Sequence, residues 1–204
     1  FTSNNANAEF WASGNNSFAP SLCKQATFDG MGGSYCALLK ASDPPIVGLA
    51  AGNLMSGIFY KDGLTTGVVE FGQPYTWTAR PYGMKVKYHA TVGIVNQAKH
   101  SGAPIGEGDQ DKARIMVAIV DWNTRREVGS GTEAPTGTWD PEEATAVDEG
   151  PIIAYGSLFI DQSSTGGKMI DVQLPLNYYD RTAKPSGLYL SLIHISEPTR
   201  QEAI

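Results

Sequence analysis

Aromatic side chains close to Arg, Asp and amide groups are the residues of this sequence best suited to chemistry. Tyr75, Trp77 and Arg80 occur together in a polar, turn-rich stretch. Sugars present C–H faces and hydroxyl edges, so a sugar site combines an aromatic platform with side chains that make paired hydrogen bonds. We interpret this stretch as a candidate glycan-binding rim. The alternative is that Trp77 packs on a sheet while Arg80 pairs with a structural carboxylate.

The other three tryptophans have different surroundings. Trp122 follows an apolar run and has Asp121 beside it, a grouping that presents either a stacking ring with polar groups or a core residue followed by a turn. Trp139 lies in a long acidic segment, where an apolar ring either packs down or receives a ligand. Trp11 is interpreted as an anchor of the first strand.

Paired carboxylates are the residues that a glycosidase would need. On one strand, the retaining kind in a jelly-roll fold uses the spacing Glu-x-Asp-x-x-Glu, because alternate residues share a face and the carboxyl groups must be about 5 Å apart. The sequence lacks this motif, and its nearest string, 107–112, ends in Lys. A pair drawn from separate strands, such as Asp121 with Asp161, stays open.

Metal and nucleophile signals are weaker. Outside the last fifteen residues, the histidines are His89 and His100, which are not spaced as zinc ligands. Glu107, Asp109 and Asp111 offer oxygen ligands to a hard cation such as calcium; the alternative is a solvated acidic loop. The sequence has no nucleophile elbow, and its glycine-rich pieces lack the Lys and helix of a phosphate-binding loop. No cofactor is expected beyond structural calcium.

Apolar residues recur with a period of two, which predicts strands. In 83–90, Met84, Val86 and Tyr88 alternate with Lys85 and Lys87, as in a half-buried strand. The run 113–122 is almost continuously apolar, as in a strand covered on both faces. Further strands are predicted at 34–39, 50–60, 152–160, 168–176 and 186–190. Glycine, proline and aspartate turns between them favour an all-β fold, an antiparallel β-sandwich of jelly-roll type.

Two polar stretches, 97–112 and 124–149, exceed hairpin length, so we expect them to be loops at one end of the sandwich. The chain has 204 residues and a net charge of −6, so no basic stripe is available for nucleic acid. No apolar run approaches the roughly 18 residues of a transmembrane helix. Cys23 and Cys36 are either one loop-closing bridge or two free thiols.

The last fifteen residues, 190–204, look like the translation of a transposase adaptor used in sequencing libraries, beginning Leu-Ser-Leu-Ile-His-Ile-Ser-Glu-Pro-Thr-Arg. We therefore expect a single domain over 1–189 that is truncated at its carboxyl end, followed by a tail that is not native. A natural closing strand replaced in this way is expected to leave a sheet edge exposed or mispaired.

Several stretches resemble the putative carbohydrate metabolism domain family of glycan-digesting gut bacteria. The matching residues are Phe-Trp-Ala-Ser-Gly-Asn at 10–15, Gly-Ser-Tyr-Cys-Ala-Leu-Leu at 33–39, Leu-Ala-Ala-Gly-Asn-Leu-Met-Ser-Gly at 49–57 and Phe-Gly-Gln-Pro-Tyr-Thr-Trp-Thr-Ala-Arg-Pro at 71–81. The resemblance covers about residues 9–189. It implies a jelly-roll sandwich like that of carbohydrate-binding modules, an extracytoplasmic location on the cell surface or in secretion, and a neighbouring immunoglobulin-like domain.

We therefore expect a glycan-binding domain of a surface or secreted protein that assists polysaccharide capture, with an oligosaccharide or polysaccharide as partner. The expected site residues are Tyr75, Trp77, Arg80, Asp121, Trp122 and Trp139. Catalysis is the less favoured reading. The alternatives are a glycoside hydrolase whose carboxylates come from separate strands and a structural or adhesive sandwich.

Overall fold

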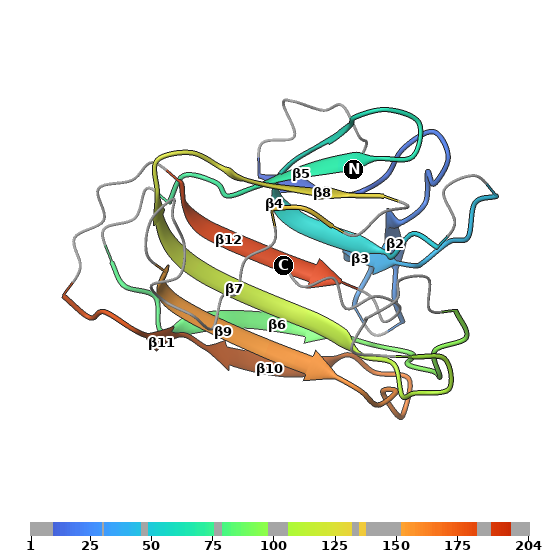
Figure 1. Cartoon of the computed structure of the whole chain (residues 1–204). Helices are drawn as coiled ribbons and strands as arrows, with labels where there is room; N and C mark the ends of the chain where they lie inside the picture. The colour runs from blue at the N-terminus through green and yellow to red at the C-terminus, as the bar shows by residue number, and fades with distance from the viewer. Residues whose placement is uncertain are drawn as a thin grey trace.

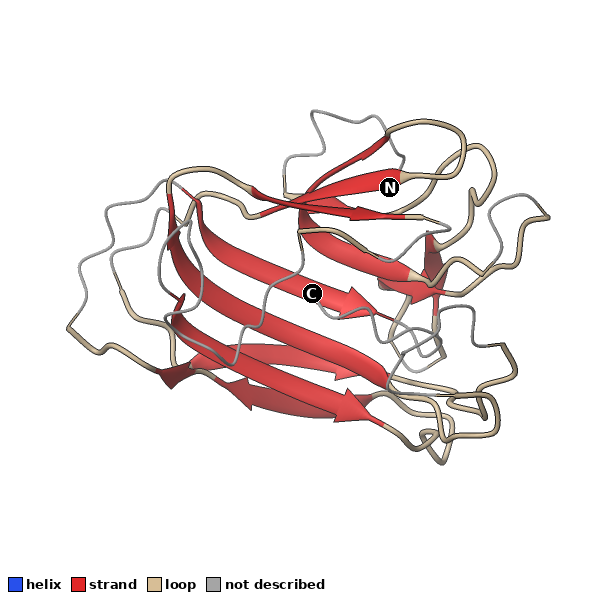
Figure 2. Ribbon diagram, in the orientation of Figure 1, coloured by secondary structure: helices blue, strands red, loops and turns tan. Residues whose placement is uncertain are grey.

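The computed structural model describes residues 10–29, 31–45, 49–75, 79–97, 106–131, 135–137, 152–182 and 189–196. Over these ranges the chain is all β, and none of them forms a helix that could cross a membrane (Figure 2). The strands are β1 (Trp11–Ala12), β2 (Cys23–Thr27), β3 (Tyr35–Leu39), β4 (Asn53–Lys61), β5 (Gly67–Phe71), β6 (Gly83–Tyr88), β7 (Ala113–Trp122), β8 (Arg126–Ser130), β9 (Ile152–Ile160), β10 (Ile170–Pro175), β11 (Asn177–Tyr178) and β12 (Tyr189–Ser196).

One large antiparallel sheet carries most of the strands, in the order β11-β9-β7-β12-β4-β5-β8, with β1 paired to β4 (Figure 1). Strands β6 and β10 form a separate pair, as do β2 and β3. The predicted all-β, antiparallel, sandwich-like fold is therefore confirmed, and jelly-roll topology stays a prediction.

Strand β7 separates two hydrophobic cores because its side chains alternate between the two faces of the large sheet. Ile115, Val117 and Ile119 pack toward β6 and β10, against Leu174 and Met84. On the other face, the buried core consists of Met55, Phe71, Met116, Ala118, Val120, Trp122, Val128, Ile152 and Tyr155. This second core joins side chains of β5 and β8 to those of β7 and β9. The large sheet must therefore curl, since β12 and β4 lie between these strands.

The period-two pattern placed several strands well. Met84, Val86 and Tyr88 of β6 pack into the first core, whereas Lys85 and Lys87 are exposed. The apolar run 113–122 is strand β7, covered on both faces, and the predicted strand 152–160 is β9.

Two expectations about loops were wrong. Residues 126–130 lie in the predicted loop 124–149 but form β8, which pairs with β5 from Phe71↔Arg126 to Gly67↔Ser130. The two polar stretches also do not share one end of the sandwich. They join opposite ends of β7, which is ten residues long, so they leave the sheet about 30 Å apart.

Strand β12 is in the interior of the large sheet. It pairs with β7 from Tyr189↔Trp122 to Ser196↔Arg114, and with β4 from His194↔Met55 to Ser196↔Asn53. The Ile193 amide also donates a hydrogen bond of 2.7 Å to Oγ of Ser56, which is fully buried. The expected exposed edge is therefore not seen between β4 and β7, and mispairing relative to a natural closing strand stays a prediction. Most of β12 comes from the segment that resembles a translated adaptor, and the sheet pairs these residues whatever their origin.

The two cysteines are not bridged. Cys23 pairs with Leu39 and Cys36 pairs with Ala26, so the cysteines are three positions apart along the β2–β3 ladder. That offset is roughly 10 Å, beyond the reach of a disulfide. Cys23 is 1% exposed, and burial raises the pKa of its thiol to about 11.

Thiol labelling tests this assignment. With Ellman's reagent at pH 8, we expect Cys36 to react in the folded protein and Cys23 to react only after denaturation, because the thiolate is the nucleophile. The Cys36→Ser variant should show no reaction while folded. Two thiols reacting at similar rates in the native protein would contradict the burial of Cys23.

Truncation tests the role of β12. A chain ending at residue 188 should lose its cooperative thermal transition, because β4 and β7 would each lose a row of backbone hydrogen bonds. The matched control ends at residue 196, keeps β12, and should melt like the full chain. Circular dichroism measures both. Equal melting of the two truncated chains would show that β12 is dispensable.

Candidate functional site

Three segments far apart in the sequence meet at the end of the sandwich where β7 finishes and β9 begins. Strand β11 pairs there with β9, Tyr178 opposite Ala154. The Tyr178 hydroxyl donates a 2.8 Å hydrogen bond to the Pro81 carbonyl, and the Leu176 amide donates a 2.9 Å bond to the Tyr82 carbonyl. These bonds fix the chain that leads into β6 against the chain that leads into β11.

The charged side chain of Arg80 contacts both Tyr178 and the backbone of Asp180. Its guanidinium carbon lies 5.8 Å from the centre of the Tyr178 ring, a cation–π distance. Its Nη1 is 3.5 Å from the Asp180 carbonyl oxygen, to which it donates a long hydrogen bond. The Asp180 carboxylate accepts bonds of 2.7 and 2.8 Å from the amide and hydroxyl of Thr182. We call Tyr75, Arg80, Tyr82 and Tyr178 the tyrosine cluster.

Electrostatics place Tyr75 close to Tyr178. The pKa of Tyr178 is raised above 10.0, chiefly by desolvation and then by interaction with Tyr75, and the positive charge of Arg80 opposes the rise. The Tyr178 phenol therefore stays protonated at neutral pH and keeps its role as a donor. The Tyr75 hydroxyl donates to the Ala79 carbonyl at 3.1 Å.

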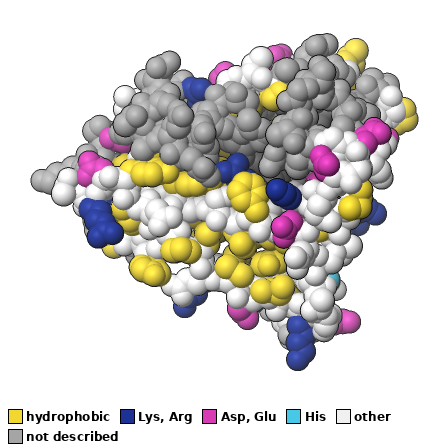
Figure 3. All heavy atoms as spheres, turned by 60° about the horizontal axis from the view of Figure 1, so that its bottom comes forward, with side chains coloured by type: hydrophobic (Ala, Val, Ile, Leu, Met, Phe, Trp, Pro, Cys, Tyr) yellow, Lys and Arg dark blue, Asp and Glu magenta, His cyan; other side chains and the backbone are white. Residues whose placement is uncertain are grey.

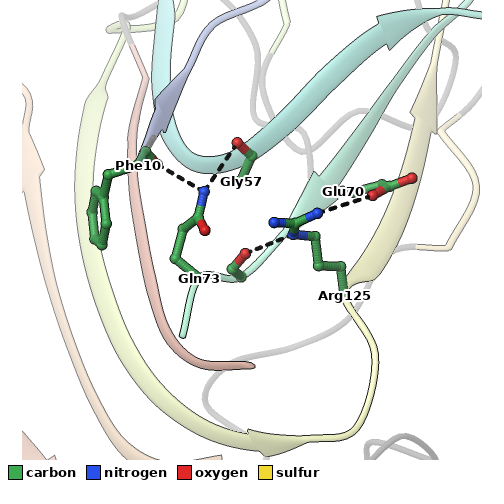
Figure 4. Close-up of polar contacts among 6 residues, drawn as sticks. Phe10, Gly57, Glu70, Gln73 and Arg125 are labelled. Carbon is green, nitrogen blue, oxygen red and sulfur yellow. Dashed lines mark hydrogen bonds and ion pairs between the residues drawn. The ribbon is translucent and has the colours of Figure 1, made fainter. Parts of the chain in front are cut away.

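A network of polar contacts anchors the chain just before Tyr75 (Figure 4). Buried Gln73 donates through Nε2 to the carbonyls of Phe10, at 3.3 Å, and Gly57, at 3.5 Å. Arg125 donates through Nε to the Gly72 carbonyl at 3.0 Å, and its Nη1 lies 3.7 Å from Oε2 of Glu70. These contacts of Gln73 and Arg125 thus fix the backbone of the stretch 71–75 before the chain reaches the tyrosine cluster.

The tyrosine cluster has the groups that recognise neutral sugars. Tyr82 is 75% exposed, Arg80 is exposed and Tyr75 is half-buried. Phenol rings present apolar faces, and the phenol and guanidinium groups supply hydrogen-bond donors. Figure 3 shows the side of the molecule toward the bottom of Figure 1, where hydrophobic side chains lie among uncharged groups and scattered charged ones.

The predicted site residues have separate outcomes. Tyr75 and Arg80 are brought together with Tyr178, as a rim requires. Trp77 and Trp139 lie outside the described residues. Trp122 is 0% exposed and belongs to the second core. Of the two interpretations of this residue, the core tryptophan is therefore the correct one, and its ring cannot stack on a sugar.

The two aspartates considered as a catalytic pair are far apart. Asp121 is near the end of β7, and Asp161 follows Ile160, which pairs with Ala113 at the start of β7. The eight-residue separation corresponds to about 25 Å, well beyond the roughly 5 to 10 Å that glycoside hydrolysis uses. This pair is excluded by the register, and Asp121 remains at the same end as the tyrosine cluster.

The acidic triplet does not converge on one point. The Asp109 carboxylate accepts the Gly106 amide at 2.8 Å, and Asp111 accepts the Lys112 amide at 2.8 Å. Burial raises the pKa of Asp111, whereas Glu107 and Asp109 are exposed. Within the described ranges, no three His, Cys, Asp or Glu side chains are grouped as metal ligands. Calcium binding by Glu107, Asp109 and Asp111 stays a prediction.

Sequence reasoning missed Tyr82 and Tyr178 as members of the cluster. Tyr178 is 97 residues from Pro81, its hydrogen-bond partner, so no local pattern joins them. The available signal was the run of tyrosines at 178–179, which follows a predicted strand.

A substitution at Gly57 tests the close approach between the backbones of β4 and β5, next to the contacts of Gln73. Gly57 has a φ of 151°, and a Cβ there would overlap the Glu70 carbonyl oxygen. Gly57→Ala should therefore destabilise the protein by more than about 1 kcal/mol. Gly93→Ala is the control, because a Cβ at Gly93 meets nothing within 4 Å. Urea unfolding of both variants measures the effect, and equal stability would show that the close approach at Gly57 is relieved at no cost.

Comparisons with known proteins give a fold and no family. A solved structure described as a putative glycoside hydrolase from Bacteroides thetaiotaomicron VPI-5482 is 17% identical, with a TM-score of 0.53 over 91% of this chain and 55% of that chain. A second structure, described as a putative glycoside hydrolase from Bacteroides vulgatus ATCC 8482, is 18% identical, with a TM-score of 0.53 over 91% of this chain and 75% of that chain. This chain thus spans about half the length of the first. No family model and no curated protein matches it. At these identities the likeness establishes a shared all-β fold.

Proposed function

We propose that this chain is a glycan-binding domain and that the tyrosine cluster is its binding site. The observation that carries the proposal is the placement of Arg80 against Tyr178, with the exposed Tyr82 two residues further along the chain. Stacking on a sugar face and hydrogen bonding to its hydroxyl edge can occur together there. Structures of this fold described as putative glycoside hydrolases support a carbohydrate-related role.

The proposed biological setting is the capture of an oligosaccharide or polysaccharide outside the cytoplasm. The domain would act as an accessory module on the cell surface or in a secreted protein, next to an immunoglobulin-like domain. Sequence resemblance to a domain family of glycan-digesting gut bacteria supports this setting, as does the origin of the two similar structures in Bacteroides.

Glycoside hydrolysis is the second candidate function, and the descriptions of the two similar structures favour it. It would require a carboxylate pair other than Asp121 with Asp161. Release of reducing sugar from mixed polysaccharides distinguishes hydrolysis from binding.

Binding measurements with site variants test the proposal. We expect a neutral oligosaccharide identified on a glycan array to bind with micromolar to millimolar affinity, as for sites with one or two aromatic faces. Tyr82→Ala should weaken this binding roughly fivefold, since one stacked ring contributes about 1 kcal/mol. Arg80→Gln should weaken it by at least as much. Isothermal titration calorimetry measures each change.

Tyr35→Ala is the matched control. Tyr35 is 68% exposed, close to the 75% of Tyr82, but it lies on β3. Its loss should leave binding unchanged. No ligand on the array would contradict the proposal and favour a structural or adhesive sandwich. Binding that survives both Tyr82→Ala and Arg80→Gln would place the glycan site elsewhere.

A further inference from the structure

A second cluster of polar and aromatic side chains lies on β7 and β9, on the face of the large sheet opposite the core against which Tyr178 packs. Arg114 donates through Nε to the Ser157 hydroxyl at 3.1 Å and through Nη2 to the Tyr155 hydroxyl. Its guanidinium carbon is 4.9 Å from the centre of the Phe159 ring. We call Arg114, Tyr155, Ser157 and Phe159 the arginine cluster.

Strand register places these four side chains on one face of the large sheet. The antiparallel pairs are Arg114↔Phe159, Met116↔Ser157 and Ala118↔Tyr155, and alternate residues of a strand share a face. This is the face of the second core, where Met116 and Ala118 are fully buried. The core ends at Arg114, because Phe159 beside it is 44% exposed. The face therefore opens to solvent at Phe159, whereas Arg114 and Ser157 are half-buried and Tyr155 is buried.

The Arg114 guanidinium donates hydrogen bonds to two neutral hydroxyl groups. Among the described residues, no carboxylate lies within ion-pair distance of its guanidinium. A guanidinium has five N–H donors, and the two hydroxyl groups accept from only two of its nitrogens. The hydroxyl groups therefore orient the guanidinium without neutralising it. In a protein of net charge −6, an oriented arginine that has no carboxylate partner among the described residues is suited to an anionic ligand.

We propose that the arginine cluster binds a carboxylate-bearing saccharide, with a uronic acid carboxylate on Arg114 and the sugar ring against Phe159. A guanidinium pairs with a planar carboxylate through two parallel hydrogen bonds. The exposed part of the Phe159 ring supplies the apolar face that a sugar ring contacts. This site is separate from the tyrosine cluster, and its ligand differs in charge. The proposal therefore stands or falls independently of the proposed function.

Calorimetric titration of the full chain with a matched pair of ligands tests the proposal. Trigalacturonate carries the carboxylates, and its methyl ester has the same sugar rings without charge. We expect the acid to bind and the ester to bind at least about tenfold more weakly. Arg114→Gln should weaken acid binding to a similar extent, and Phe159→Ala should weaken it roughly fivefold.

Two further variants separate the effect of charge from that of hydrogen-bond geometry and control for an exposed cation. Arg114→Lys keeps the charge but loses the paired geometry, so its binding should fall between wild type and Arg114→Gln. Arg114→Lys also replaces Arg114→Gln in the binding test if thermal melting shows that Arg114→Gln does not fold. Lys87→Gln is the control for an exposed cation, since Lys87 lies on β6 and pairs with Asp171 at 2.9 Å. Lys87→Gln and Tyr82→Ala should leave acid binding unchanged.

Several results would overturn the proposal. Equal binding of the acid and its ester would show that no carboxylate is recognised, as would acid binding unaffected by the Arg114 variants. Competition by acetate at the concentration of trigalacturonate would show that the site takes any carboxylate and not a saccharide. Loss of acid binding in Tyr82→Ala would assign the ligand to the tyrosine cluster.

Discussion

The hydrogen bonds that β12 makes on both of its edges hold the large sheet together. Strands β4 and β7 do not pair with each other, and β12 joins them. Backbone groups of buried strands need partners, and an unpaired row would cost several hydrogen bonds at once. Because β7 separates the two cores, the packing on both of its faces depends on this position being filled.

The same scaffold positions two binding surfaces by different means. The tyrosine cluster is built mainly from connections before β6 and around β11, which the Tyr178–Pro81 and Leu176–Tyr82 hydrogen bonds hold together. The arginine cluster is built on the strands, where the β7–β9 register alone places Arg114 opposite Phe159. Sites on strands vary less in geometry than sites on connections.

Local patterns predicted the strands but only part of the site. Strand β9 was predicted with its observed bounds, because the run is apolar apart from Gly156 and Ser157. Strand β8, with the sequence Arg-Glu-Val-Gly-Ser, was missed since a polar strand looks like a loop until its partner is known. Tyr75 and Arg80 were predicted because they are near in sequence. Tyr178 and the arginine cluster depend on register and on long-range contacts, which period-two patterns do not specify. The buried state of Trp122 likewise required the second core to be seen.

Glycan recognition at the tyrosine cluster is the central claim, and NMR tests it most directly. Backbone amide shifts of the labelled protein would be followed during titration with a neutral oligosaccharide that binds. The account predicts shifts that saturate with one affinity and centre on Arg80, Tyr82 and Tyr178. Shifts confined to other parts of the fold, or no shift at a saturating concentration of ligand, would contradict it.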